Sequence, residues 1–430
     1  MSNKKTAAVA AAAAESEVDV TVNNVDVVTK YTTAADISNQ VLKKVIAAVV
    51  DGARVLDICI LGDKAIEEGT KGVYNKDKTQ KGIGFPTCIS VNNIICNFSP
   101  LPSDPEAASV IKTGDMVKIQ LGAQIDGFAA IVAHTVVVGA SAENPIKGRK
   151  ADVLQAAHLA LEAAIRLVKP GAKNMDVTKV ITQIADAFEV KPVEGQISFN
   201  QERNVIDGKK QIIQAPSEQQ LHDFERVEFA ENEVYAVDIL ITSSAEGKPK
   251  PGAARTSVYK KTDTRYELKM KTSRAVLKEL NTKFGQFPFP LRDLEDEKKA
   301  RMGILECAKH HLVLPYEVLY DKEGSLDVLF LYYSPSVDEN FVSYFNTPSH
   351  TPPTPNPLDA FVAQFLATIL LTKNGTLKVT SPPFDQSIVQ SDKSLKNETL
   401  IALLATSLKP KKNKKKAVEG EAEKKEEEAK

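Results

Sequence analysis

The segment Val117–Gly139 (VKIQLGAQIDGFAAIVAHTVVVG) contains two positions that could hold metal-binding side chains. Two apolar runs flank the Asp-Gly pair at 126–127, which is typical of a type I′ turn, so the segment is predicted to be a β-hairpin. In that hairpin Gln120 lies opposite Ala133, and positions 120 and 131 become diagonal neighbours on one face. Two carboxylates placed there could share a pair of metal ions. The sequence has Gln120 and Ile131 instead, and neither supplies a charged oxygen.

Other residue types that could do chemistry form no recognisable motif. There is no Ser/His/Asp order, no glycine-rich phosphate loop and no zinc-type spacing. The four cysteines lack a CxxC spacing, which is typical of reduced cysteines in a cytosolic or nuclear protein. No cofactor and no metal site are therefore predicted.

The elements that position the hairpin repeat along the chain. Helices are predicted at about 32–51, 55–68, 149–168 and 177–188, and strands at 89–91, 94–96, 233–240 and 361–371. Gly52 and Gly171 end the first helix of each pair, and each break reads Gly-Ala-x-x-x-Asp. Asp57 and Asp176 are each expected to cap the second helix. This internal duplication predicts a pseudo-twofold α/β domain with a cleft between its halves.

Length and charge limit the class of protein. The chain has 430 residues, which suits one large α/β domain with insertions. Its 55 Lys+Arg balance 56 Asp+Glu, so the molecule as a whole is not a polyelectrolyte. No apolar run is long enough to span a membrane, and no membrane partner is predicted. Residues 1–28 are expected to be disordered, without the apolar stretch of a signal peptide, and residues 406–430 to form a charged, disordered tail.

One segment has an extreme local charge. Lys248–Lys278 contains ten Lys/Arg and two acids, and a helix of mixed charge follows over 294–311. A solvated surface is the ordinary interpretation of a charge run, but such a patch can also release counterions from a phosphate backbone. The lysines of the tail could contact the same nucleic-acid partner or act as a nuclear or nucleolar localisation signal. The alternative is that they only keep a disordered tail soluble. The residues predicted to contact nucleic acid are Lys248, Lys250, Arg255, Lys260, Lys261, Lys269, Lys271, Arg274, Lys298, Lys299, Arg301, Lys411, Lys412, Lys414, Lys415 and Lys416.

Near the C-terminus, Leu400, Leu403 and Leu404 form an LxxLL pattern. An amphipathic helix that packs on its own domain is the favoured interpretation. A docking motif for a transcriptional co-regulator is the alternative.

The chain resembles the proliferation-associated, curved-DNA-binding family, which shares the "pita-bread" fold of type 2 methionine aminopeptidases. The resemblance covers most of residues 29–405 in order. It rests on GFPTCISVNN (84–93), NFSP (97–100), VKIQLG, IDGF, AHT (133–135), LVKPG, VYAVDIL, LKMKTSRA (268–275), EDEKKARMGILECAKH (295–310) and FVAQF (361–365). It implies an α/β pita-bread domain over 29–405 with an inserted helical subdomain at about 250–320, which includes the basic segment.

The resemblance also implies where the enzymes of this fold hold metal. Their five ligand positions fall here at Gln120, Ile131, Gln196, Asp238 and Leu366, and the position of their substrate histidine falls at Asn97. Two hydrolytic metal ions need carboxylate or imidazole ligands, and one remaining carboxylate cannot hold them. We therefore expect no peptidase activity.

Residues 325–359 have no counterpart in this resemblance. They are aromatic, poor in charge and end in a proline cluster. A disordered insertion and an unspliced intron in the gene both remain open.

The resemblance implies a non-enzymatic protein that binds RNA and ribosomes in ribosome biogenesis, translation and growth or transcriptional regulation. Its expected partners are the ribosome and ribosomal RNA, with curved DNA and transcriptional co-regulators as further candidates. Cytoplasm and nucleus or nucleolus are the expected locations, and a monomer is the expected state. The alternatives are a metal-dependent N-terminal aminopeptidase and a protein specific for curved DNA.

Overall fold

The structure is a computed structural model that describes residues 19–75, 79–321 and 360–408. Its central sheet has the strand order β1-β3-β4-β15-β9-β7-β8, with β16 paired to β15 and β6 paired to β9. All neighbours in this sheet run antiparallel. The strands are β1 (Lys81–Val91), β3 (Met116–Ile125), β4 (Phe128–Val137), β6 (Lys191–Pro192), β7 (Ile197–Gln201), β8 (Gln211–Ile213), β9 (Val234–Thr242), β15 (Val362–Thr372) and β16 (Gly375–Lys378).

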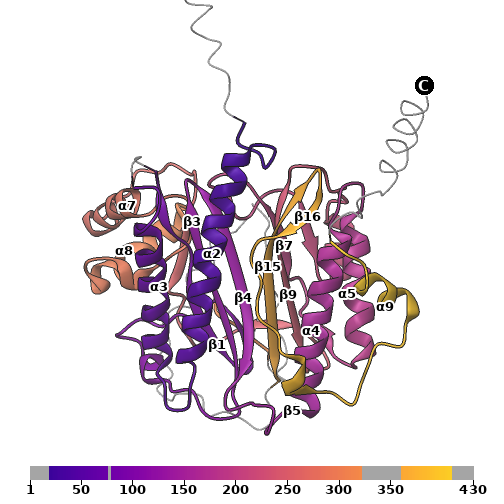
Figure 1. The fold of residues 1–430 in the computed structure, drawn as a ribbon. Helices are drawn as coiled ribbons and strands as arrows, with labels where there is room; N and C mark the ends of the chain where they lie inside the picture. The colour runs from indigo at the N-terminus through magenta and orange to yellow at the C-terminus, as the bar shows by residue number, and fades with distance from the viewer. Residues whose placement is uncertain (1–18, 76–78, 322–359, 409–430) are drawn as a thin grey trace, which may run out of the picture.

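Two pairs of helices cover one face of the sheet (Figure 1). They are α2 (Val25–Ala48) with α3 (Val55–Lys71), and α4 (Gly148–Leu167) with α5 (Asn174–Ala187). Each pair packs its apolar stripe on its own half of the sheet, which gives two separate core clusters. Helices α2 and α4 end at Ala48 and Leu167, four residues before the predicted stops Gly52 and Gly171. These two glycines lie in matching turns before α3 and α5, with φ of +79° and +83°, a backbone conformation that favours glycine. The predicted duplication and the pita-bread fold are therefore confirmed.

Two details of these helices differ from the sequence prediction. Helix α2 begins at Val25, not near Thr32, because Asn24 caps it and Val27 is buried beside Tyr31, whose ring packs on Phe128. Residues 25–28 are therefore helical and not disordered.

The two aspartates of the repeat are not caps. Helix α3 begins at Val55 as predicted, and α5 begins at Asn174, three residues before its expected start. Asp57 and Asp176 therefore lie inside the first turns of these helices. There a carboxylate still interacts favourably with the positive end of the helix. The caps themselves, Arg54 and Lys173, each form an isolated β-bridge, to Val110 and Glu228, which adds a further match between the halves.

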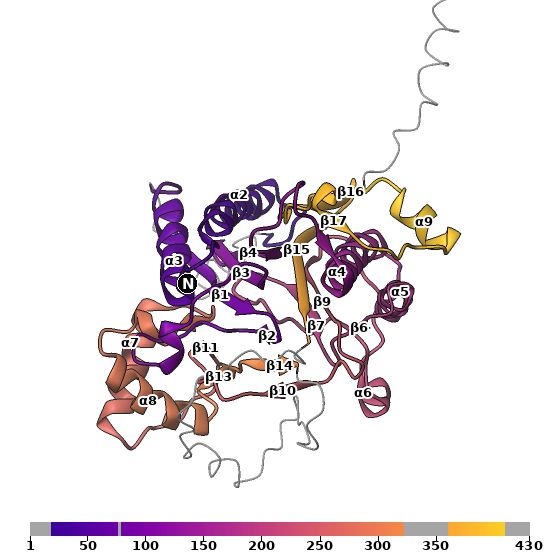
Figure 2. The same ribbon diagram turned by 90° about the horizontal axis from the view of Figure 1, so that it is seen from below.

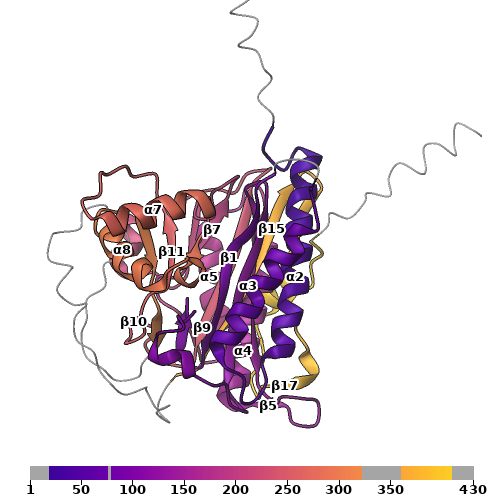
Figure 3. The same ribbon diagram turned by 90° about the vertical axis from the view of Figure 1, so that its left-hand side faces the viewer.

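An insert lies on the other face of the sheet, and Figures 2 and 3 show it opposite the helix pairs. It contains β10 (Pro249–Pro251), β11 (Val258–Lys261), α7 (Lys271–Lys283), β12 (Phe289–Pro290), the 3-10 turn η2 (Leu291–Asp293), α8 (Glu297–Lys309), β13 (Val313–Tyr316) and β14 (Leu319–Asp321). Helices α7 and α8 pack on each other around a core of their own, which includes Leu280, Phe289 and Ile304. Short strands accompany the expected helices.

One buried ion pair joins the insert to helix α3 of the first half. Arg292 of η2 pairs with Asp63 of α3, and their side chains are 4 % and 7 % exposed. Arg292 Nη1 also donates to Ser99 Oγ at 2.6 Å, and Asp63 Oδ1 accepts from the backbone N–H of Thr87 at 2.7 Å. The insert is therefore anchored to a helix and a strand of the first half.

The remaining elements are short. They are β2 (Ile94–Cys96), η1 (Pro105–Ala108), β5 (Ile146–Lys147), α6 (Glu218–Asp223), η4 (Gln386–Ile388), β17 (Val389–Gln390) and α9 (Glu398–Leu404). Strand β14 pairs with β10 and β2, which links the insert to the first half again. Across the described ranges, every helix is too short or too polar to cross a membrane.

Candidate functional site

The positions that the resemblance assigns to metal ligands come together on the insert-facing side of the sheet. Gln120 pairs with Ala133, Ala133 with Leu366, and Leu366 with Asp238, which forms one row across β3, β4, β15 and β9. Ile131 lies two residues along β4 on the same face. The predicted register of the hairpin is confirmed, and φ values of 55° and 83° at 126 and 127 match a type I′ turn.

Asp238 is held by side-chain amides. Its carboxylate accepts from Gln196 Nε2 at 2.8 Å and from Gln364 Nε2 at 2.9 and 3.1 Å. Gln364 Nε2 also contacts Gln120 Oε1 at 3.2 Å. Burial raises the pKa of Asp238 from 3.8 to about 7, although the amide hydrogen bonds act in the opposite direction. Gln196 and Gln364 are therefore the neutral hydrogen-bonding partners of the carboxylate, and Gln120 is joined to it only through Gln364.

Gln364 is a site residue that sequence reasoning missed. It is 1 % exposed, and its backbone is joined to β4 because Thr135 Oγ1 donates to Gln364 O at 2.8 Å and accepts from Gln364 N at 2.7 Å. A signal was present in FVAQF: the residue two places before Leu366 on a strand shares its face. Polar residues at that spacing on a buried strand mark a site.

Apolar side chains occupy the other two ligand positions. Ile131 and Leu366 belong to one buried cluster with Phe85 and Phe287, which come from β1 and the insert. Asn97, at the position of the substrate histidine, has a φ of 62°, and its Nδ2 donates to Glu317 O at 3.0 Å. The sheet surface around Ile131 and Leu366 is therefore a packed apolar contact with the insert.

A buried lysine next to the row also escaped prediction from the sequence. Lys118 lies on the same face of β3 as Gln120 and is 1 % exposed. Its Nζ donates to Asn92 O at 2.8 Å and to Val362 O at 3.1 Å, and burial lowers its pKa to about 7. These bonds connect β3 with the start of β15.

The donor set does not fit a pair of divalent metal ions. Asp238 supplies the one carboxylate of the row, and the amides of Gln120 and Gln196 carry no charge. Such ions are held in peptidases by several carboxylates or imidazoles. In the part of the chain that the structure describes, no three His, Cys, Asp or Glu side chains are grouped as a metal site requires. No step through a metal ion can be derived from these residues.

The predicted nucleic-acid residues separate into two groups. Several are already paired within the fold: Arg255 with Asp104 at 3.3 Å, Lys299 with Asp296 at 3.0 Å, Arg301 with Glu297 at 3.8 Å, and Lys261 Nζ with Asn281 Oδ1 at 3.1 Å. Lys260 is buried and pairs with Asp207, so its predicted place on the binding surface is wrong. Lys260 lies on β11, and its side chain points toward Asp207 in the segment that follows β7.

The second group is exposed on helix α7. Lys271 and Arg274, together with Lys278, are spaced by three and four residues and lie along one face of the helix. Within residues 79–321 and the other described ranges, none of the three forms an ion pair with an acid. Lys248, Lys269 and Lys298 are also exposed. We name Lys271, Arg274 and Lys278 the α7 stripe.

The LxxLL leucines pack on the domain itself. Leu400 on α9 is 4 % exposed and joins the core beneath α4, and Leu403 and Leu404 pack beside it half-buried. This placement favours the self-packing interpretation. Lysines 411, 412, 414, 415 and 416 and residues 325–359 lie outside the described residues.

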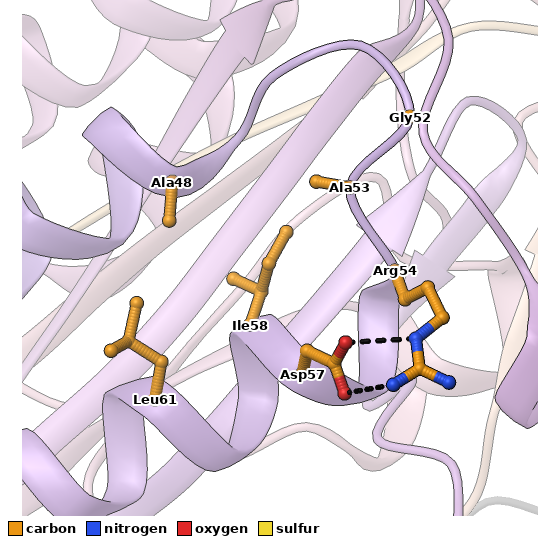
Figure 4. A pocket seen from close by; sticks show the side chains of 7 residues that line it. All are labelled: Ala48, Gly52, Ala53, Arg54, Asp57, Ile58 and Leu61. Carbon is orange, nitrogen blue, oxygen red and sulfur yellow. Dashed lines mark hydrogen bonds and ion pairs between the residues drawn. The ribbon is translucent and has the colours of Figure 1, made fainter.

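An open depression lies at the start of α3, on the helix-covered side of the sheet and not on the insert-facing side that carries Asp238. Ala48, Ala53, Ile58 and Leu61 supply its apolar lining, and Arg54 binds Asp57 there at 2.8 and 2.9 Å (Figure 4). Its one acid and one base neutralise each other. It shares no residue with the row around Asp238.

Comparison with known proteins agrees with this geometry. Residues 29–255 match the family described as Metallopeptidase family M24. A curved DNA-binding protein of Schizosaccharomyces pombe is 42 % identical over 94 % of this chain and 97 % of its own. ERBB-3 binding protein 1 of Arabidopsis thaliana is 40 % identical over 92 % and 90 %.

A solved structure supports the same assignment. The structure of a thermophilic Arx1 superimposes with a TM-score of 0.77 at 33 % identity and covers 90 % of this chain and 99 % of that one. The chain therefore belongs to metallopeptidase family M24, among relatives that are named curved DNA-binding protein, ERBB-3 binding protein and proliferation-associated protein.

Proposed function

We propose that this protein is not a peptidase, and that it binds RNA and ribosomes in ribosome biogenesis, translation and growth regulation. The α7 stripe is the observation that carries the proposal. Three exposed cations on one helix face, without acids to neutralise them in the described structure, can approach successive phosphates. The resemblance described above, for which ribosomal RNA is the expected ligand, supports the proposal, and α7 belongs to the insert.

The first test reverses the charge of the stripe. In the triple variant Lys271→Glu, Arg274→Glu and Lys278→Glu, affinity for ribosomal RNA is expected to fall by about 10²-fold near 0.15 M salt, because each phosphate contact contributes about fivefold there. The slope of log affinity against log salt is expected to fall by about 2 to 3, since each contact contributes about 0.7 to 0.9. Filter binding and ribosome co-sedimentation across a salt series measure both quantities.

A matched control reverses three exposed lysines on the other side of the sheet. Lys43→Glu, Lys44→Glu and Lys64→Glu change the net charge equally, but from α2 and α3. Their effect is expected to be small. If both triple variants bind alike, the α7 stripe is only a solvated face. If removal of residues 409–430 abolishes binding and the stripe variant does not, the tail is the anchor.

Curved DNA is the second candidate ligand, because one relative has that name. The α7 stripe contacts phosphates in either nucleic acid, so the stripe variant cannot separate the two. Competition at fixed salt can. We expect ribosomal RNA to displace a bent DNA duplex at lower concentration than the duplex displaces the RNA, and the reverse order would favour the DNA-binding alternative.

The proposal also predicts no peptidase activity. With cobalt, manganese or zinc, the purified protein is expected to release no methionine from short peptides, because Asp238 is boxed in by amides and Ile131 and Leu366 are apolar. Turnover measured by mass spectrometry that disappears in Asp238→Ala would contradict this. We further propose that the protein is present in cytoplasm and nucleus, which imaging of a tagged chain can check.

A further inference from the structure

A second exposed stripe, of different chemistry, lies on helix α8. Lys298, Met302, Leu305 and Lys309 are spaced by four, three and four residues, so they form one line along the helix. Met302 and Leu305 are each 55 % exposed, and both lysines are exposed at the ends of the line. The opposite face of α8 is buried in the insert core. We name these four residues the α8 stripe.

The segment before α7 widens this stripe on one side. The ring of Tyr266 stacks on His310 at 3.7 Å, and the backbone N–H groups of Lys269 and Met270 donate to Glu306 at 3.1 and 3.3 Å. Tyr266 and Met270 are 42 % and 46 % exposed. Glu306 keeps its charge, but its carboxylate is bound to these backbone donors and forms no ion pair with Lys298 or Lys309 within the described residues.

Four large apolar side chains are thus exposed together on the insert. Isolated exposed apolar residues are ordinary, but a contiguous group rimmed by charge marks an interaction surface. Two of the four are methionines, whose flexible thioethers adapt to a partner. Lys298 and Lys309 lie beyond the apolar centre at either end.

We propose that the α8 stripe binds an acidic amphipathic helix of a partner protein. Apolar side chains of that helix would cover Met302 and Leu305, and its carboxylates would pair with Lys298 and Lys309. The spacing of four, three and four residues is the one that helices use when they pack side by side. A nucleic-acid backbone has no aliphatic surface to cover Met302 and Leu305, so RNA remains assigned to the α7 stripe.

The test uses a labelled helical peptide of about 20 residues, long enough to remain largely helical when stapled. It carries leucines at alternating spacings of three and four, with glutamates beside them. Fluorescence anisotropy with the full chain is expected to show saturable binding. Met302→Glu with Leu305→Glu is expected to weaken it at least about tenfold, equivalent to about 1.4 kcal/mol. Lys298→Glu with Lys309→Glu is expected to weaken it and to reduce its salt dependence.

Two protein controls separate this surface from the other features. Leu61→Glu changes an exposed leucine on α3 and is expected to leave peptide binding unchanged. The α7 triple variant is expected to retain the peptide, so failure of the RNA proposal and failure of this one are distinguishable. Circular dichroism melts should show that the Met302→Glu, Leu305→Glu chain is folded, since both side chains are exposed.

Three results would overturn the proposal. The first is equal binding by a scrambled peptide or by the Met302→Glu, Leu305→Glu chain. The second is loss of binding in the α7 variant to the same extent, which would show attraction by net charge alone. The third is concentration-dependent self-association of the wild-type chain in sedimentation that this double variant removes, which would identify a second copy as the occupant.

Discussion

Loss of the charge on Arg292 is expected to destabilise the protein by about 3–5 kcal/mol. Arg292→Met leaves Asp63 with its negative charge in a site where both side chains are almost inaccessible. Asp63 would retain the Thr87 N–H as a donor, which solvates a carboxylate only in part. The midpoint of urea unfolding measures the loss, and hydrogen exchange of α7 and α8 shows whether the insert opens first.

The same pair provides a cycle that separates charge from packing. Asp63→Asn alone should cost a similar amount, because it leaves the guanidinium unpaired. The double variant Asp63→Asn, Arg292→Met removes both charges, and its cost is expected to be well below the sum of the two single variants. Arg54→Met is the matched control, since Arg54 and Asp57 are more than half exposed and such pairs contribute about 0–1 kcal/mol. Additive single costs would mean that the two charges do not interact.

Asp238 is expected to make the protein less stable as pH rises. Its pKa is about 7 in the folded chain and 3.8 ordinarily, so the folded state holds the proton more tightly. Between these two values the unfolded state binds fewer protons, and the free energy of unfolding therefore falls as pH rises through about 4 to 7. The full effect is about 4 kcal/mol, from about 3 pH units at 1.36 kcal/mol each.

Asp238→Asn isolates this contribution. The variant cannot ionise at this position, so its stability relative to wild type should increase by up to about 4 kcal/mol between pH 4 and pH 8. Asp293 also contributes to the pH dependence of stability, because burial raises its pKa to about 7. It is present in both the wild-type chain and the variant. The wild-type minus variant difference in urea unfolding, measured at each pH, cancels that shared contribution. A difference that does not change with pH would mean that Asp238 is ionised throughout.

Local sequence was sufficient to predict the hairpin and the absence of metal-binding carboxylates from its face. An Asp-Gly turn sets the register of two strands, so the sequence alone places positions 120 and 131 on one face. The duplication was predictable for the same reason, because Gly52 and Gly171 each form a turn between two helices by a local backbone conformation. The absence of a carboxylate or imidazole at four of the five ligand positions is a matter of residue type alone.

Tertiary structure decided what stands in place of a metal site and which cations remain free. Asp238 and Gln364 are far apart in the chain, and only the pairing of β9 with β15 brings the amide to the carboxylate. Lys260 and Lys271 look alike in the sequence, but Lys260 meets Asp207 and Lys271 meets no acid within the described residues. Charge type is a property of a residue. Its neutralisation depends on which distant residue the fold places within a few ångströms, and no local pattern encodes that distance.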